Sequence, residues 1–390
     1  MEKTMKETID AYIRNNIDEL HELLEALVRI PAPSRHEEDR AAFCKKWLEA
    51  QGAEGVFIDE VKNCVYPINC EGRDDLVVFA AHTDTVFPDT EPFELKNDGK
   101  RFYAPGVGDD TACLAILLMT AKFFIRNGIK SNCGVLIVAN ACEEGLGNLK
   151  GVKQIMKDYA GRVRRFYTFD GTYDEVVCKC VGSYRYEIEC RTEGGHSFSA
   201  FGKSNAIVEL AEVIAKLYRV GIPQKAGTRT TYNVGMIEGG TSVNAIAQSA
   251  KMLYEYRSDD AECLDYMKTQ FETVIEEANR KGKANFEVRT IGVRPCGEEV
   301  DPIVLNEMTE RTISVCEACS GIPCKKGSGS TDCNIPMSLG VPSVCVGLYL
   351  GRGAHTREES LEIDSLPVGM NICFQIMQKE FSRGNSNGSI

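Results

Sequence analysis

Two kinds of hydrophobic pattern alternate along the first 182 residues. Three short runs have the character of buried strands: almost every position is apolar in DLVVFAA (75–81) and GVLIVAN (134–140), and a third, RRFYTFD, ends at Asp170. The segments before and between them, including the amphipathic stretch 1–30 and the apolar stretch 111–127, repeat their apolar residues at helical spacing and predict helices. Because continuous apolar strands separated by helices are typical of a sheet covered on both faces, the pattern predicts an α/β domain with a largely parallel sheet.

The pattern changes after residue 182. Alternating and amphipathic segments predict, in chain order, a strand at 184–192, a helix at 204–219, strands at 230–237 and 246–257, a helix at 260–281 and a strand at 284–291. This β-α-β-β-α-β order is that of a ferredoxin-like α+β sandwich. A helix at 303–320 and the run SVCVGLYL (343–350) return to the first pattern. We therefore expect a discontinuous domain, 1–182 and 293–390, with a second domain, 183–292, inserted into it.

Composition excludes several classes of protein. The chain has 390 residues, of which 43% are hydrophobic and 26% charged, and its formal net charge is −12. These fractions are typical of globular proteins rather than of disordered, collagen-like or coiled-coil chains. Because an acidic chain without a block of Lys and Arg repels phosphate groups, we expect neither nucleic acid nor an anionic membrane as a partner. The longest apolar stretch, about fourteen residues with Lys122 inside it, is too short and too charged to span a bilayer.

Seventeen cysteines do not indicate a disulfide scaffold. They make up about 4% of the chain, which is below the density of disulfide-rich secreted domains. The first residues also lack the apolar core of a secretory signal, so we expect a reduced protein in the cytoplasm. Two patterns, Cys178/Cys180 and Cys316/Cys319/Cys324, are interpreted as ordinary thiols. A thiol-based redox or iron–sulfur protein is the alternative that the abundance of cysteine leaves open.

The candidate chemistry lies at the ends of the predicted strands. His82 follows the run 75–81 directly, and Asp84 comes two positions later. This arrangement suits a metal ligand whose other ring nitrogen is held by a carboxylate, although a buried structural histidine explains the pattern equally well. Asp109 and Asp110 precede the apolar helix, where only one of them can serve as its N-cap.

Other carboxylates and another histidine occupy similar places. Glu143 and Glu144 follow the second run, Asp170 ends the third, and His355 follows SVCVGLYL. Adjacent carboxylates at the end of a buried strand are costly unless a cation or a proton compensates, and a solvated loop is the alternative. Because the carboxyl ends of parallel strands meet at one edge of a sheet, these groups are expected to converge there. Imidazole and carboxylate donors favour Zn²⁺, Mn²⁺ or Co²⁺, and one bridging carboxylate would leave a glutamate free as a base.

Six motifs together resemble those of the M20 family of co-catalytic zinc metallopeptidases and deacylases: AHTDTVFP, GVGDDTACLA, ACEEGLG, FDG, GGHSFSA and GAHTREE. The resemblance extends from His82 to His355. It implies a zinc-exopeptidase-like catalytic domain and an inserted lid and dimerisation domain. The sequence departs from the family at Thr111-Ala112, where many members carry a lysine after the aspartate pair.

The resemblance implies a role for each site residue. His82 and Asp170 would bind one metal, Glu144 and His355 would bind the other, and Asp109 would bridge the two. In the remaining roles, Glu143 would be the general base, Asp84 would orient His82, His196 would reach the active site of a partner subunit, and Asn244, Arg257, Gly329 and Ser330 would contact the substrate.

The predicted function is that of a dinuclear metal-dependent hydrolase that cleaves amide bonds of short peptides, like a tripeptidase or a carboxypeptidase. Zinc is the expected metal, with manganese or cobalt as alternatives, and a homodimer through the lid domain is expected. An N-acyl amino-acid deacylase uses the same machinery and is the main alternative. A metal-binding homologue without catalysis is a further alternative, although the set of ligand candidates and the candidate base are both complete in this sequence.

Overall fold

The computed structural model describes residues 2–297 and 300–381. The chain divides into two compact units, Met1–Lys179 with Glu299–Ile390, and Cys180–Glu298. The expected insertion, 183–292, falls inside the second of these units.

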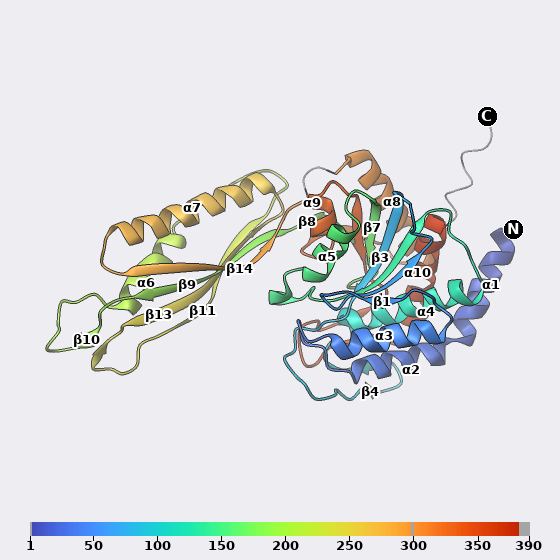
Figure 1. Cartoon of the computed structure of the whole chain (residues 1–390), viewed down its shortest axis with the longest axis horizontal. Coiled ribbons are helices and arrows are strands. Elements are labelled where there is room, and N and C mark those ends of the chain that lie inside the picture. The colour runs from blue at the N-terminus through green and yellow to red at the C-terminus, as the bar shows by residue number, and fades with distance from the viewer. Residues whose placement is uncertain (1, 298–299, 382–390) are drawn as a thin grey trace. The chain divides into compact units, whose positions relative to one another are not determined.

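An eight-stranded sheet forms the centre of the first unit (Figure 1). Its strands, in spatial order, are β1 (Phe57–Ile58), β2 (Cys64–Ile68), β6 (Gly134–Asn140), β3 (Leu76–His82), β7 (Val163–Thr168), β16 (Ser343–Val346), β8 (Glu175–Cys180) and β15 (Lys325–Gly329). The neighbours β6, β3, β7 and β16 are parallel, whereas β2 pairs antiparallel with β6 and β8 pairs antiparallel with β16. The prediction of a largely parallel sheet is therefore corrected to a mixed sheet. The sequence pattern did not indicate the flanking strands because β2, the short apolar segment CVYPI, contains Pro67, and because β8 is partly exposed and carries Glu175 and Lys179.

Helices cover both faces of this sheet. The side chains of Val77, Phe79 and Ala81 on β3 join one hydrophobic core, and those of Leu76, Val78 and Ala80 join another, as the alternation of a strand requires. The first core is completed by α1 (Glu2–Asn15), α2 (Ile17–Val28), α3 (Glu38–Ala50), α4 (Cys113–Arg126), α8 (Pro302–Ser320) and α10 (Ser365–Phe381). The second is completed by α5 (Lys150–Asp158) and α9 (Asn334–Ser338). Because both faces of β3 are covered, all seven of its residues are buried, and all except His82 are apolar.

Three predicted elements of the first unit have different bounds in the structure. The helix expected over 1–30 is broken at Asn16, whose side-chain amide donates a hydrogen bond to the carbonyl of Tyr12 and so competes with the helical backbone. The helix expected from residue 111 begins at Cys113, because Val107–Ala112 form a separate turn, η1. The last apolar run is a strand only as far as Val346.

A small second sheet in the first unit consists of β17 (Gly351–Arg352), β18 (Ser360–Glu362), β5 (Arg101–Tyr103) and β4 (Lys96–Asn97). All of its pairings are antiparallel. It brings the chain after residue 350 against the chain just before η1, so two distant segments meet beside that turn.

The second unit is a four-stranded antiparallel sheet with two helices. The sheet order is β11 (Thr230–Gly239), β13 (Ser249–Ser258), β9 (Gly182–Arg191) and β14 (Asn285–Arg294), and the helices are α6 (Ala206–Leu217) and α7 (Ala261–Arg280). Asn205 and Asp260 cap these helices by accepting hydrogen bonds from the backbone of Ile207 and Cys263. The strand predicted at 246–257 is divided into β12 (Ala245–Ile246), which pairs with β10 (Gly195–His196), and β13.

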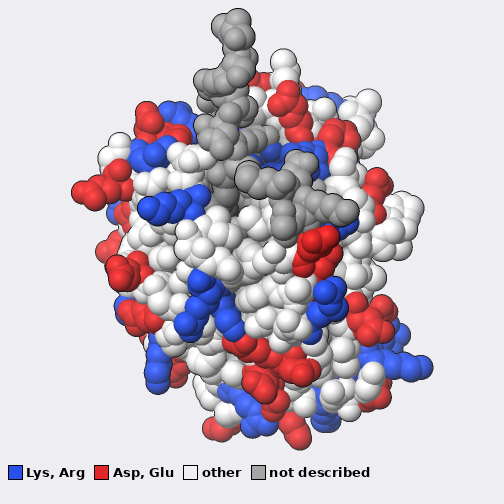
Figure 2. Space-filling model, turned by 90° about the vertical axis from the view of Figure 1, so that its right-hand side faces the viewer, with Lys and Arg blue, Asp and Glu red and all other residues white. Residues whose placement is uncertain are grey.

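Charges of both signs are interspersed on the face drawn in Figure 2. Among the helices within the described ranges, none combines the length and the apolar character that crossing a bilayer requires.

Candidate metal centre

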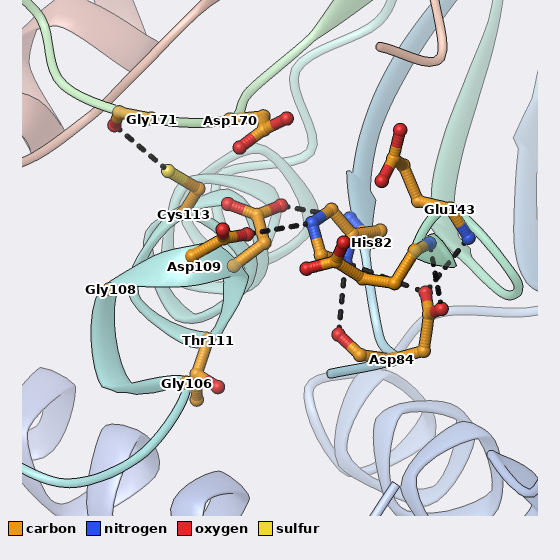
Figure 3. A network of polar contacts seen from close by, with 12 residues as sticks. His82, Asp84, Gly106, Gly108, Asp109, Thr111, Cys113, Glu143, Asp170 and Gly171 are labelled. Atoms are coloured by element: carbon orange, nitrogen blue, oxygen red, sulfur yellow. Dashed lines mark hydrogen bonds and ion pairs between the residues drawn. The ribbon is translucent and has the colours of Figure 1, made fainter. Parts of the chain in front are cut away.

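The predicted site residues of the first unit converge where its parallel strands end (Figure 3). His82 is the last residue of β3. Glu143 and Glu144 are the third and fourth residues beyond the end of β6, and Asp170 is the second residue beyond the end of β7. Since these three strands are parallel neighbours, their carboxyl ends lie at the same edge of the sheet. The turn η1 brings Asp109 to that edge.

The donor atoms form three groups, of which one is His82, Glu143 and Glu144 and the other two share Asp109. The first of these two is His82, Asp109 and Asp170, and the second is Asp109, Glu144 and His355; within each, one donor atom per residue lies within 4.8 Å of the others. One oxygen of Asp109, Oδ1, lies 3.1 Å from His82 Nε2, and the other, Oδ2, lies 3.1 Å from His355 Nε2. The two oxygens of one carboxylate thus face two separate donor sets, as a bridging ligand requires.

The electrostatics of the cluster fit bound divalent cations. Burial raises the pKa of Asp170 and raises that of Glu144 to about 7. Hydrogen bonds to Asp109 and Glu144 raise the pKa of His355 to about 11. Burial by itself would raise the pKa of Asp109, but hydrogen bonds from His355 and His82 hold it below its usual range. A bound cation would stabilise the negative charge of these crowded, buried carboxylates, which otherwise depends on the neighbouring imidazoles. These residues therefore fit a dinuclear site of nitrogen and oxygen ligands.

Asp84 lies beneath the site and accepts several hydrogen bonds. Its Oδ1 accepts from the backbone N–H of Glu143 at 2.9 Å, and its Oδ2 accepts from that of Glu144 at 2.9 Å and from Ser34 Oγ at 2.5 Å. The Nδ1 atom of His82 lies 3.0 Å from the carbonyl of Asp84 and 3.5 Å from its carboxylate. The carboxylate therefore positions the two glutamates at least as directly as it orients His82.

Glu359 holds the turn that carries Asp109. It is buried, and it accepts hydrogen bonds from the backbone N–H groups of Gly106 at 2.7 Å, Gly108 at 2.9 Å and Asp109 at 2.8 Å. A side chain at Gly108 would overlap the ring of Tyr349, so the turn also depends on glycine there. The peptide bond between Asp109 and Asp110 is cis, and Asp110 accepts a hydrogen bond from the backbone of His82.

We expect Glu359→Gln to destabilise the protein by about 1–3 kcal/mol, because glutamine offers one acceptor oxygen and leaves a buried N–H unpaired. Denaturant unfolding measures this loss. Glu358→Gln, at the exposed neighbouring position, is the matched control. Equal stability of both variants would contradict this role of Glu359.

Sequence reasoning missed Glu359, Ser34 and Arg40. Glu359 lies in the charged run REESLE, which is typical of a solvated loop, yet its partners are about 250 positions earlier, with a separation of 251 for Gly108. Ser34 and Arg40 likewise have no local signal, because Ser34 bonds to Asp84 and Arg40 bonds both to Thr83 and to the carbonyls of Leu27 and Ile30, more than one helical turn away.

Two predicted substrate contacts lie on the loop after β15. Gly329 ends that strand and Ser330 follows it. Two residues on, Asp332 is buried, and its carboxylate accepts a hydrogen bond from Asn140 Nδ2 at 2.7 Å. Burial raises the pKa of Asp332 to about 7. The loop is therefore tied to the end of β6, three residues before Glu143.

Three further predicted residues belong to the second unit. His196 is exposed on β10, and its Nδ1 accepts a hydrogen bond from the backbone of Phe198 at 3.3 Å. Asn244 is exposed, and its side chain accepts a hydrogen bond from Ser242. Arg257 forms a two-pronged contact with Glu255 on its own strand, at 3.0 and 3.1 Å. Their roles stay predictions.

Similarity to known proteins decides the family. Residues 78–379 match the model of peptidase family M20/M25/M40. The chain belongs to this family. Together with the two ligand groups, this membership makes the protein a hydrolase of amide bonds.

Solved structures of M20-type proteins share the fold. A tripeptidase from Staphylococcus aureus superposes with a TM-score of 0.74 at 22% identity, over 94% of this chain and 99% of the other. A dinuclear metal-binding peptidase of the M20 family from Bacillus subtilis gives 0.64 at 16% identity, over 94% and 99%. In sequence, an acetylornithine deacetylase from Myxococcus xanthus is 25% identical over 333 residues, 83% of each chain.

Proposed function

We propose that this protein is a dinuclear exopeptidase of the M20 family that hydrolyses short peptides, as a tripeptidase or a carboxypeptidase does. The observation that carries the proposal is the pair of ligand groups joined by Asp109. His82 and Asp170 would hold one metal, and Glu144 and His355 the other. Zinc is the metal we expect, with manganese or cobalt suiting the same donors. Two such cations supply a water of lowered pKa and polarise the carbonyl of the substrate.

Glu143 is the residue that would move the proton. It is buried, its backbone is fixed by Asp84, and its carboxylate lies within 4.8 Å of donor atoms of His82 and Glu144. In the first step its carboxylate accepts a proton from the attacking water as the C–O bond forms. In the second it returns that proton to the leaving amine as the C–N bond breaks, so the carboxylate is regenerated.

A deacylase function is the alternative that a specific observation supports, because a relative matched over 83% of this chain carries the name acetylornithine deacetylase. Both activities break an amide bond with the same residues. A panel of dipeptides and tripeptides beside N-acetyl and N-succinyl amino acids separates them. We expect turnover of the peptides; turnover of the acylated amino acids alone would contradict the exopeptidase assignment.

We further propose that residues 183–292 form a ferredoxin-like lid that also makes a homodimer. The element order β-α-β-β-α-β and the sheet order β11-β13-β9-β14 support the ferredoxin-like arrangement. Phe198, Phe201 and Val243 support the dimer, since their exposed fractions are 87%, 92% and 101%. The pairing of β10 with β12 places their two segments side by side. Large apolar side chains exposed in this way are typical of an interface.

Phe198→Ser combined with Phe201→Ser is expected to convert a dimer into a monomer, as measured by light scattering after size-exclusion chromatography. Activity is expected to fall with the dimer if His196 completes the partner's site and if Asn244 and Arg257 contact substrate as predicted. Tyr266→Ser, at a 41% exposed position on α7, is the control. A wild-type protein that stays monomeric at micromolar concentration would rule out the dimer.

The compartment that we propose is the cytoplasm. All seventeen cysteines lie within the described ranges and none is in a disulfide, including those of the Cys178/Cys180 and Cys316/Cys319/Cys324 patterns. Free thiols in this number suit a reducing compartment. The metal-ligand groups found in residues 2–297 and 300–381 use histidine and carboxylates only.

A further inference from the structure

Arg40 is a buried cation beneath the metal centre. It lies on α3 with a residue exposure of 2%. Its Nη1 donates to the carbonyl of Thr83 at 2.9 Å and to Thr111 Oγ1 at 3.4 Å, and its Nη2 donates to the carbonyls of Leu27 and Ile30 at 2.8 and 2.9 Å. These oxygens all come from uncharged groups.

The environment of the Arg40 guanidinium offers it no direct counter-charge. Within the described part of the chain, no carboxylate lies at ion-pair distance from Arg40, and its Nε has no hydrogen-bond partner. Burying a charge without a counter-charge is costly. The nearby acidic groups that interact with it are the thiol of Cys44 and the carboxyl groups of Asp84 and Asp110, all fully buried. Burial lowers the pKa of Arg40 to about 10, so it stays charged at neutral pH.

The contacts of Arg40 join the segments that carry the metal-centre residues. Thr83 lies between His82 and Asp84, and Thr111 follows the Asp109–Asp110 pair on the turn shown in Figure 3. Leu27 and Ile30 belong to the end of α2 and the residues after it. One side chain thus connects the end of β3, the turn η1 and the N-terminal helices.

We infer that Arg40 is a positioning residue of the metal centre, whose charge balances that of Asp84 while its hydrogen bonds fix the β3 end against η1. The inference rests on the proposed dinuclear site. Thr111 Oγ1 lies 3.4 Å from Nη1 of Arg40, so these two side chains are neighbours. A lysine at position 111 would therefore place a cation beside the position of the guanidinium.

This idea is tested by moving the charge. Arg40→Met and Arg40→Ala remove the charge, Arg40→Lys keeps it, and Arg40→Ala combined with Thr111→Lys transfers it to the neighbouring position. Lys46→Met, an exposed substitution on the same helix, is the control. Zn²⁺ affinity is measured by competition with a chromophoric chelator, alongside kcat, KM and the melting temperature of the metal-free protein.

Arg40→Met is expected to lower Zn²⁺ affinity and kcat at least about tenfold, the effect typical of residues that support metal ligands, with KM changed less than about twofold. Arg40→Lys and the double variant are expected to recover most of the affinity that Arg40→Ala loses. A purely structural role predicts no such recovery. The inference is overturned if Arg40→Met binds Zn²⁺ like the wild type, or if the double variant binds no better than Arg40→Ala. A wild-type protein that binds no metal would instead overturn the proposed function.

If Arg40→Met does not fold, Thr111→Lys in the wild-type background tests the same idea. It places a second cation against Arg40, and we expect the two charges to lower both the melting temperature and the Zn²⁺ affinity. Wild-type values for this variant would overturn the inference.

Discussion

Glu143→Ala is expected to reduce turnover by about 10²- to 10⁴-fold while the protein keeps its metals, because general acid–base catalysis contributes an effect of this size. The metal ligands in the proposed assignment do not include Glu143, so its loss should leave both ligand groups complete. Its backbone contact with Asp84 does not need the side chain and should persist. Steady-state kinetics and metal analysis on the same preparation measure the two effects.

Glu60→Ala, an exposed glutamate of the same unit, controls for the loss of a carboxylate. Near-normal activity of Glu143→Ala would contradict the role of Glu143 as the base. Loss of metal together with activity would show that Glu143 is a ligand. The experiment must separate these roles because donor atoms of His82, Glu143 and Glu144 also lie within 4.8 Å of one another.

Asp109→Asn is expected to remove metal and activity together. The carboxylate oxygens of Asp109 face both imidazoles at 3.1 Å, and asparagine replaces one of these oxygens with an NH₂ group that cannot bind a cation. Loss of a residue that hydrogen-bonds to a metal ligand typically lowers metal affinity or activity by about 10- to 100-fold. Loss of a ligand shared by both metals should therefore lower activity by more than about 100-fold.

Metal analysis of Asp109→Asn should find fewer than two metals per chain. Asp74→Asn, whose side chain is 84% exposed, is the matched control. A variant that retains two metals and normal turnover would show that Asp109 does not bridge.

The convergence of His82, Glu144 and Asp170 could be predicted from the sequence more fully than the edges of the sheet. These residues follow strands that are largely buried, so the apolar runs place them at a strand end or up to four residues beyond it. Their convergence then follows from the parallel order of those strands. Near the edges, β2 is a short apolar segment that contains Pro67, and β8 is partly exposed and carries Glu175 and Lys179, so neither has the pattern of a central strand.

The residues that support the site could not be predicted from the sequence, for a different physical reason. Glu359, Ser34 and Arg40 act through hydrogen bonds to partners between 10 and 253 positions away. No spacing rule within a window of helix or strand length records such a contact. The break at Asn16 was missed because the apolar periodicity continues on both sides of it.

The central claim is that two metals held by these residues carry the reaction. Metal content per chain, measured together with tripeptide hydrolysis before and after exhaustive chelation and after return of Zn²⁺, tests it most directly. We expect two metals per chain, loss of hydrolysis on chelation and recovery when the metal is restored. Hydrolysis that survives complete removal of metal would contradict it.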